Sequence, residues 1–258
     1  MNNHESKQNV KLPKIGSLKK YNELMDIIRN RITVRKFDPS YEVPLEHFNL
    51  ILEAARHAPS GANSQPWHFI IVQEKQIKSL ISEYFVNEQK FRARAKMKFP
   101  TPDYRGLKDA PGFIIVCSDM RWTNAFPVFK NDKTDLNRMY RQNAERILLQ
   151  SVASATMSAH LAASALGYNV WWVTAIGQEN AQKEIKPLLG IPKEISVLDI
   201  MLFGPSAQKP YKRWRKPLNE IVNYNKFDKK NMMSDKELDE WIKTKRHKVM
   251  FKDASRID

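Results

Sequence analysis

The sequence contains little cysteine and no long hydrophobic run. Cys117 is the only cysteine among 258 residues, which excludes an internal disulfide and any metal site built from several cysteines. No apolar stretch approaches the roughly 20 residues that a membrane-spanning helix needs. The first residues, MNNHESKQNVKLPK, lack the apolar segment of a signal peptide. These absences predict a soluble, cytoplasmic protein.

The composition nevertheless supplies a hydrophobic core. Hydrophobic residues make up 42% of the chain and aromatic residues 10%, which excludes a disordered or collagen-like protein. A chain of this length folds as one large domain or as two small ones.

Positive charge is in excess. The chain has 43 Lys and Arg residues against 28 Asp and Glu residues, for a formal net charge of +15. Such a charge attracts polyanions, anionic surfaces and acidic ligands, so a nucleic-acid or anionic-surface binding protein is one alternative function. The sequence contains no RNA-recognition motif, zinc finger or convincing helix-turn-helix, which argues against that alternative.

Helical and strand-like patterns alternate irregularly along the chain. Apolar residues at helical spacing predict helices over residues 21–30, 44–58, 135–166, 181–189 and 235–248. Short apolar runs predict strands over residues 68–73, 113–117, 170–176 and 197–203. Because the order is not a regular βαβ repeat, the pattern favours an α+β fold over a doubly wound sheet.

Both ends of the chain differ from the middle. Residues 1–20 are predicted to form a basic N-terminal arm, residues 21–222 the domain, and residues 223–258 a C-terminal extension too polar to form its own core. We expect this extension to cross to a second subunit. Residues 90–99 alternate basic and apolar side chains, which is compatible with an exposed strand, but their composition favours a basic helix or lid.

Two short segments carry pairs of arginines. The first is Arg31-Ile32-Thr33-Val34-Arg35 and the second is Arg213-Trp214-Arg215. Arginine presents a planar fork of donors that matches phosphate oxygens, so both segments are candidate anion sites. Taken singly, each pair could equally belong to a solvated, ion-paired surface.

A third segment, APSGANSQPW at residues 58–67, contains prolines, one glycine and several polar side chains. Prolines stiffen such a loop, and Gly61 allows close approach of a ligand or of another backbone. Its hydroxyl and amide groups suit a polar heterocycle. The alternative is a tight helix-to-strand connection whose side chains cap the neighbouring elements.

Together these segments resemble the nitroreductase superfamily of flavoproteins. The resemblance lies in RITVRKF at 31–37, APSGANSQPWHFIIV at 58–72, LGYNVWWVTAI at 166–176 and GPSAQKPYKRWRKPLNEIV at 204–222. It implies an α+β homodimer whose central, mostly antiparallel sheet is flanked by helices, with FMN bound at the subunit interface.

The resemblance also implies which residues contact FMN, with the loop at 59–65 contributed by the partner chain. These residues are Arg31, Ile32, Thr33, Arg35, Pro59, Ser60, Gly61, Asn63, Gln65, Asn87, Lys90, Val173, Thr174, Ala175, Arg213 and Arg215. Arg31, Thr33 and the late arginine pair match phosphate contacts, while Arg35 matches a contact on the ribityl and pyrimidine side.

The implied activity is reduction of a nitroaromatic, quinone or similar electron-poor small molecule with NADH or NADPH. The chemistry is carried by FMN, with Arg35 as the cation that tunes the reduced ring, so no side chain is assigned as a catalytic acid or nucleophile, and no metal is expected. Specialised relatives that dehalogenate, fragment flavin or dehydrogenate remain alternatives.

Three buried residues need no catalytic role. Trp171 and Trp172 are adjacent on a predicted strand, so their side chains point to opposite faces and at most one can approach a flavin. Cys117 lies within an apolar strand and is expected to be an inert, buried thiol.

Overall fold

A four-stranded sheet forms the centre of the protein. The computed structural model describes residues 13–97, 102–128 and 134–252. The strands are β1 (Trp67–Ile71), β2 (Gly112–Asp119), β3 (Asn169–Val173) and β4 (Ile195–Gly204). Their order is β1-β2-β4-β3, and every neighbouring pair is antiparallel. The predicted α+β class with an antiparallel sheet is confirmed.

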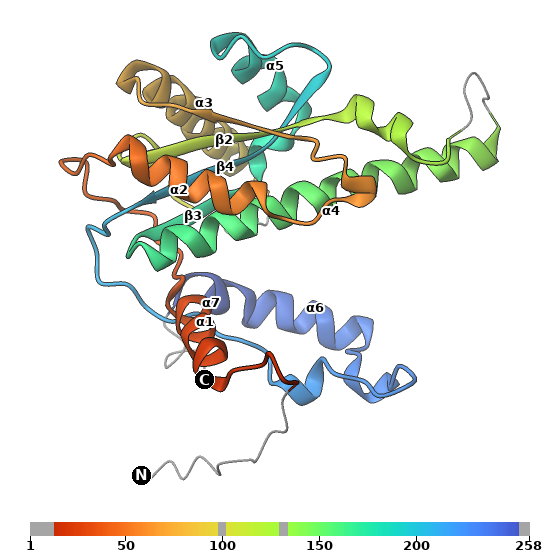
Figure 1. The fold of residues 1–258 in the computed structure, drawn as a ribbon. Coiled ribbons are helices and arrows are strands. Elements are labelled where there is room, and N and C mark those ends of the chain that lie inside the picture. The colour runs from red at the N-terminus through yellow and green to blue at the C-terminus, as the bar shows by residue number, and fades with distance from the viewer. Residues whose placement is uncertain (1–12, 98–101, 129–133, 253–258) are drawn as a thin grey trace.

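Helices cover both faces of this sheet. Helices α2 and α4 cover one face, and α3 and α5 cover the other (Figure 1). The helices are α1 (Leu18–Asn30), α2 (Leu45–Arg56), α3 (Lys75–Arg94), α4 (Asp135–Ala165), α5 (Glu179–Leu188), α6 (Asp235–Thr244) and α7 (Arg246–Phe251). Among the residues that the structure describes, no helix is both long enough and apolar enough to cross a membrane.

Strand β2 shows why the apolar runs became strands. All its positions are buried, because it has a neighbouring strand on each side and helices on each face. A strand enclosed in this way favours a continuous apolar run, which explains FIIVC before the polar end at Ser118 and Asp119. Cys117 is fully enclosed there, and burial raises the pKa of its thiol to about 12. The prediction of an inert thiol is consistent with this environment.

The remaining helices lie outside the two layers. Helices α1, α6 and α7 lie on the outer side of α4, away from the sheet (Figure 1). The Ser164 hydroxyl on α4 donates to the carbonyl of Ile27 on α1 over 3.3 Å, which attaches the first helix to the layer. Helix α6 begins at a capping box in which Ser234 and Glu237 satisfy each other's backbone groups. Its crossing to a second subunit stays a prediction.

The structure corrects several sequence-based boundaries. The run at 170–176 is a strand only as far as Val173, because Thr174 adopts helical backbone angles and opens a short 3-10 turn. The helix predicted over 235–248 is two helices that meet at Lys245.

Helix α3 was missed over most of its length. It continues through Lys90 to Arg94, so the favoured helical alternative for the basic segment is correct up to that point. Residues 98 and 99 of that segment lie outside the described residues, as do residues 1–12 of the predicted N-terminal arm.

Candidate functional site

Backbone hydrogen bonds bring the two arginine segments together. The Val34 N–H donates to the Val170 carbonyl over 3.0 Å, and the Val170 N–H donates to the Ile32 carbonyl over 3.2 Å, which holds residues 31–35 against β3. The next residues run beside the chain that leaves β4, because the Ala207 N–H donates to the Lys36 carbonyl over 3.0 Å. Arg213 and Arg215 follow on that same segment.

The result is an arginine cluster, formed by Arg31, Arg35, Arg213 and Arg215. Burial, and then the charge of Arg215, lower the pKa of Arg31. Burial, and then the charge of Arg213, lower the pKa of Arg35. Within the described ranges, none of the four forms an ion pair with a carboxylate. Like charges are therefore held together with no carboxylate of the described residues paired to them.

Arg35 lies between two aromatic rings. Its Cζ is 5.6 Å from the ring centroid of Trp171 and 5.4 Å from that of Phe251. Tyr104 stacks against Trp171 at 5.9 Å and extends this wall. The Nε atom of Arg35 is buried and has no hydrogen-bond partner among the described residues. A buried guanidinium donor without an acceptor is costly, so a missing acceptor is indicated.

The other arginines also make polar contacts within the protein. Arg213 donates to the Met250 carbonyl over 2.9 Å and to the Tyr211 hydroxyl, and its Cζ lies 4.0 Å from the Tyr211 ring centroid. Arg31 donates to the Thr33 hydroxyl over 3.4 Å. Arg215 is exposed and donates to the carbonyl of Trp214 over 2.8 Å. These contacts use only part of the donor capacity of each guanidinium.

The loop at 58–67 is a well-defined, strained turn. Its three residues Ala62, Asn63 and Gln65 have positive φ values of 52°, 49° and 43°. The Ser60 hydroxyl accepts the Gln65 N–H over 3.1 Å, and the Gln65 side chain donates to Asn63 over 3.1 Å. Strain of this kind persists only where surrounding structure enforces it, and it concentrates at functional sites.

Gly61 anchors that loop on α4. Its N–H donates to the Ser151 hydroxyl over 3.1 Å. A Cβ at this position would come within 2.2 Å of the Ile147 side chain, so glycine is required by the close approach. Among the described residues, the side-chain bonds of this loop stay within it, and its bond to α4 comes from a backbone N–H, so the alternative in which its side chains cap the neighbouring elements stays open.

The loop and the arginine cluster meet α4 at different points. Gly61 binds at Ser151, whereas Arg31 acts electrostatically on His160. The separation of 160 − 151 = 9 residues corresponds to about 14 Å along the helix axis. Among the described residues, no hydrogen bond joins this loop to any of the four arginines.

Asn87 and Lys90 are also apart from the cluster. Asn87 lines a cavity of about 520 Å³ between α3 and α5, beside Glu184 and Leu188. Among the described residues, neither Asn87 nor Lys90 forms a hydrogen bond or ion pair with any of the four arginines. Their predicted flavin contact stays a prediction.

The end of β3 connects the arginine cluster to the sheet. Val173 is buried opposite Ile200 of β4, Thr174 is exposed, and Ala175 begins the 3-10 turn. Trp171 lies two residues earlier and contacts Arg35. Val173, Thr174 and Ala175 therefore follow directly on the strand that supports the cluster.

Sequence reasoning missed a second group of polar residues, the buried polar cluster of His160, Trp172 and Asp199. His160 stacks on Trp172 at 5.2 Å, and both of its ring nitrogens are buried without a hydrogen-bond partner among the described residues. Burial, aided by the charge of Arg31, lowers the pKa of His160 to about 3. Burial raises the pKa of Asp199 to about 6, against the opposing effect of Trp172 and Thr156. Burial therefore disfavours the charged form of both groups.

Comparison with known proteins decides the family. Residues 28–204, well over half of the chain, match the nitroreductase family. The protein belongs to the nitroreductase family. It is accordingly an oxidoreductase enzyme of the NAD(P)H nitroreductase type.

Named relatives agree with this assignment. An Archaeoglobus fulgidus protein with the provisional name NADH dehydrogenase/NAD(P)H nitroreductase is 28% identical over 190 residues, which cover 73% of this chain and 89% of the relative. The NADPH:FMN oxidoreductase of Vibrio harveyi, solved with NAD⁺, has a TM-score of 0.64 at 18% identity and covers 85% of this chain and 83% of its own. An FMN-dependent nitroreductase of Clostridium difficile has a TM-score of 0.56 at 24% identity, over 79% of this chain and 99% of its own. At these identities the structural matches establish the fold.

The arginine cluster of this nitroreductase fits a phosphate group. It offers several permanent cations, a buried donor without an acceptor, and no protein carboxylate in an ion pair with it among the described residues. Arginine does not relieve such repulsion by losing its proton at ordinary pH, whereas a bound anion relieves it. Trp171 and Tyr104 are buried and stack on each other beside Arg35, so they form one wall of the cluster.

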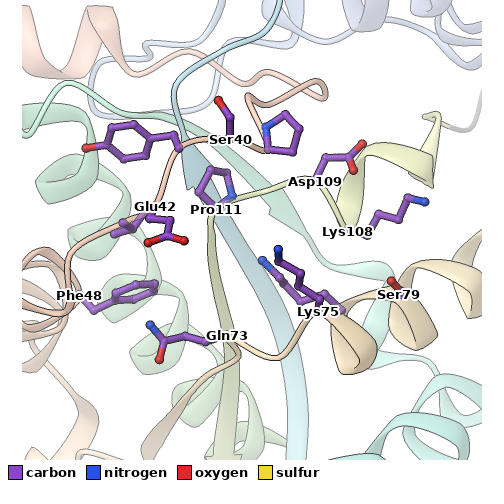
Figure 2. Close-up of a pocket in the computed structure, with 13 residues that line it drawn as sticks. Ser40, Glu42, Phe48, Gln73, Lys75, Ser79, Lys108, Asp109 and Pro111 are labelled. Carbon is purple, nitrogen blue, oxygen red and sulfur yellow. The ribbon is translucent and has the colours of Figure 1, made fainter.

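A separate cavity of about 640 Å³ is lined by groups of both charge signs. Glu42 projects toward it from the segment before α2, and Gln73 and Lys75 from the connection between β1 and the start of α3 (Figure 2). Lys78 is buried at its wall and donates to the Ala110 carbonyl over 3.0 Å, which ties α3 to the segment before β2. Because its lining mixes acidic and basic groups, this cavity does not favour ligands of one charge, whereas the arginine cluster favours anions.

Proposed function

We propose that this nitroreductase is a homodimeric, FMN-dependent enzyme that oxidises NADH or NADPH and reduces a nitroaromatic, quinone or similar electron-poor small molecule. The observation that carries the proposal is the arginine cluster, whose paired like charges lack a protein counter-ion among the described residues. FMN brings a phosphate for these arginines and, when bound, supplies the hydride-transfer chemistry of its ring system.

Three members of the cluster are assigned to two parts of FMN in this proposal. Arg31 and Arg215 bind the phosphate, with the Thr33 hydroxyl as a further polar group beside Arg31. Arg35 lies next to the aromatic wall of Trp171 and Tyr104, so it faces the pyrimidine side of the flavin. A fixed cation there stabilises the negative charge that the ring gains on reduction.

A second copy of the chain supports the site from the other side. The loop at 59–65 is anchored on α4 at Ser151, and in this proposal it contacts the flavin that the arginines of the partner chain bind. Large apolar side chains are exposed on α1 and α4, among them Leu24, Leu136, Met139 and Leu149. Exposed apolar surface of this kind is typical of an interface between subunits. A molar-mass measurement by light scattering is expected to give twice the 30.1 kDa chain mass.

The function is tested with the purified full-length protein and added FMN. We expect FMN to bind with quenched fluorescence, and anaerobic NADH or NADPH to bleach the visible absorption of the bound flavin. Subsequent addition of a nitroaromatic or a quinone should restore the oxidised spectrum. A protein that takes up no FMN would overturn the proposal, and one whose flavin neither nucleotide reduces would refute the reductase activity.

A matched pair of variants locates the phosphate site. Arg215→Ala removes charge-assisted bonds worth about 1.5–3 kcal/mol each and is expected to weaken FMN binding about tenfold or more. Lys216→Ala, which removes the adjacent exposed cation, should leave binding within about twofold, because exposed charges contribute little. Equal effects of both substitutions would indicate attraction by overall charge rather than a specific contact.

A further inference from the structure

The last turn of α7 contacts the arginine cluster at three points. The Phe251 ring lies over the Arg35 guanidinium at 5.4 Å. The Met250 carbonyl accepts a hydrogen bond from Arg213 over 2.9 Å. The Phe251 carbonyl accepts one from the Tyr211 hydroxyl over 2.8 Å, and that hydroxyl in turn accepts from Arg213. The C-terminal end of the described chain is thus joined to two of the four arginines.

The rings of Trp171 and Phe251 both contact Arg35, with their centroids 5.6 Å and 5.4 Å from its Cζ. Two such contacts restrict where this long side chain can lie. Its Nε is buried and has no hydrogen-bond partner among the described residues, so one donor of the restricted side chain is left for a ligand. The two rings therefore help to fix the position of the Arg35 guanidinium.

Helix α7 also offsets the repulsion within the cluster. Arg35 and Arg213 are close enough that the charge of Arg213 lowers the pKa of Arg35. The C-terminal end of a helix carries partial negative charge on its free carbonyls, and Met250 and Phe251 place two such carbonyls beside Arg213 and Tyr211. The face of an aromatic ring is likewise attractive to a cation. These contacts stabilise the packing of the polar C-terminal extension against the domain.

We propose that α7 is part of the flavin site, where Phe251 is a positioning residue that holds Arg35 against Trp171 and the last carbonyls of α7 hold Arg213. The inference rests on the proposed function, because it concerns how the FMN-binding arginines are arranged. It assigns to the C-terminal extension a role in cofactor retention within the chain that carries it.

The test compares Phe251→Ala, Phe251→Trp and the control Phe227→Ala in the full-length protein. Phe227 is an exposed aromatic residue of the same C-terminal region. We expect Phe251→Ala to raise the FMN dissociation constant about 3–10-fold, the size of one cation–π contact, while Phe251→Trp stays within about twofold of wild type. Phe227→Ala should bind as wild type does.

The reduction potential of bound FMN gives an independent readout. Without Phe251, Arg35 is no longer fixed beside the ring, so the potential of Phe251→Ala should become more negative, and Phe251→Trp should restore it. Wild-type affinity and potential in Phe251→Ala would overturn the inference. A second result would also overturn it: Phe251→Ala loses FMN affinity and has a lower thermal midpoint, and Phe251→Trp does not restore the affinity. That result would indicate a purely structural role for Phe251.

Tyr211→Phe tests the hydrogen-bonded half of the contact. It keeps the ring beside Arg213 but removes the hydroxyl between Arg213 and the Phe251 carbonyl, and it should weaken FMN binding about 2–5-fold. Unchanged binding would refute a role for that hydroxyl. If the wild-type protein binds no FMN, the proposed function fails, whereas wild-type binding with an unaffected Phe251→Ala contradicts only the inference about α7.

Discussion

The two polar clusters beside β3 differ in whether their groups can lose their charge. Trp171 faces the arginine cluster, and its neighbour Trp172 faces the buried polar cluster on the opposite side of the sheet, as alternation along a strand requires. The prediction that the adjacent tryptophans point to opposite faces is confirmed. Both clusters contain buried polar atoms without partners among the described residues.

Burial acts differently on the two clusters. It lowers the pKa of His160 to about 3, so this imidazole is uncharged near neutral pH, and it raises the pKa of Asp199 to about 6. Arginine keeps its proton far above neutral pH, so the arginine cluster remains charged despite its lowered pKa values. An unpaired buried donor on a permanent cation therefore indicates a bound anion in the arginine cluster, whereas His160 avoids a buried charge by staying deprotonated.

The largest expected effect comes from the buried histidine. Its folded-state pKa of about 3 lies below the unfolded value of 6.5, so the unfolded state binds more protons as the pH falls. The contribution of His160 to the free energy of unfolding is complete above pH 6.5. Below pH 6.5 it falls by about 1.4 kcal/mol for each pH unit, so the total loss approaches about 5 kcal/mol at pH 3. Urea unfolding of wild type and His160→Gln between pH 7 and pH 4.5 should show the wild type losing stability faster.

The control for this measurement is His68→Gln, because His68 is exposed at β1. It should follow the wild-type pH dependence. Parallel curves for wild type and His160→Gln would mean that His160 is charged or solvated in the folded protein, which would remove the contrast between the two clusters.

Asp199 should show the opposite pH dependence. Its folded pKa of about 6 exceeds the ordinary 3.8, so its stabilising contribution is present below pH 3.8 and is lost as the pH rises to 6. Asn resembles the protonated carboxyl group. Asp199→Asn should therefore be about 3 kcal/mol more stable than wild type at pH 8, with the difference disappearing near pH 4. Asp26→Asn, on the exposed surface of α1, should change stability little at either pH.

Arg31→Gln separates function from stability in the arginine cluster. Loss of one charge-assisted phosphate contact should weaken FMN binding about 10–100-fold. The FMN-free protein should not become less stable, because the substitution also relieves repulsion from Arg215. Fluorescence titration and urea unfolding, with the exposed Arg29→Gln as control, test both statements. Destabilisation of the FMN-free variant would show that Arg31 is a structural residue.

Local sequence patterns predicted most of the fold because they reflect local physical requirements. The continuous apolar run at Phe113–Cys117 required a strand enclosed on all sides, and Pro59 with Gly61 marked the end of α2. The pattern was less informative for α3, where mean burial is low and polar residues dominate, so only its basic end was identified. Thr174 ended β3 through its backbone angles, which residue type alone does not specify.

Only part of the candidate site was accessible from sequence. The two arginine pairs were identified by residue type, and backbone pairing of Ile32 and Val34 with Val170 explains why they meet. Phe251 and His160 were missed, because no spacing relates Phe251 to Arg35 or His160 to Trp172 before the chain is folded. Contacts between residues so far apart in the sequence are set by the topology of the whole fold.

The smallest expected effect concerns the Thr33 hydroxyl, which accepts a hydrogen bond from Arg31. Arg31 donates to the Thr33 hydroxyl over a long 3.4 Å, so this bond is weak. Thr33→Val keeps the branched side chain at the bridge to Val170 and removes only the hydroxyl, which should weaken FMN binding about 2–5-fold. A loss of affinity as large as that of Arg31→Gln would instead show that the hydroxyl itself binds the phosphate. The permanent charges, which distinguish the arginine cluster from His160 and Asp199, would then contribute less of the FMN affinity than we propose.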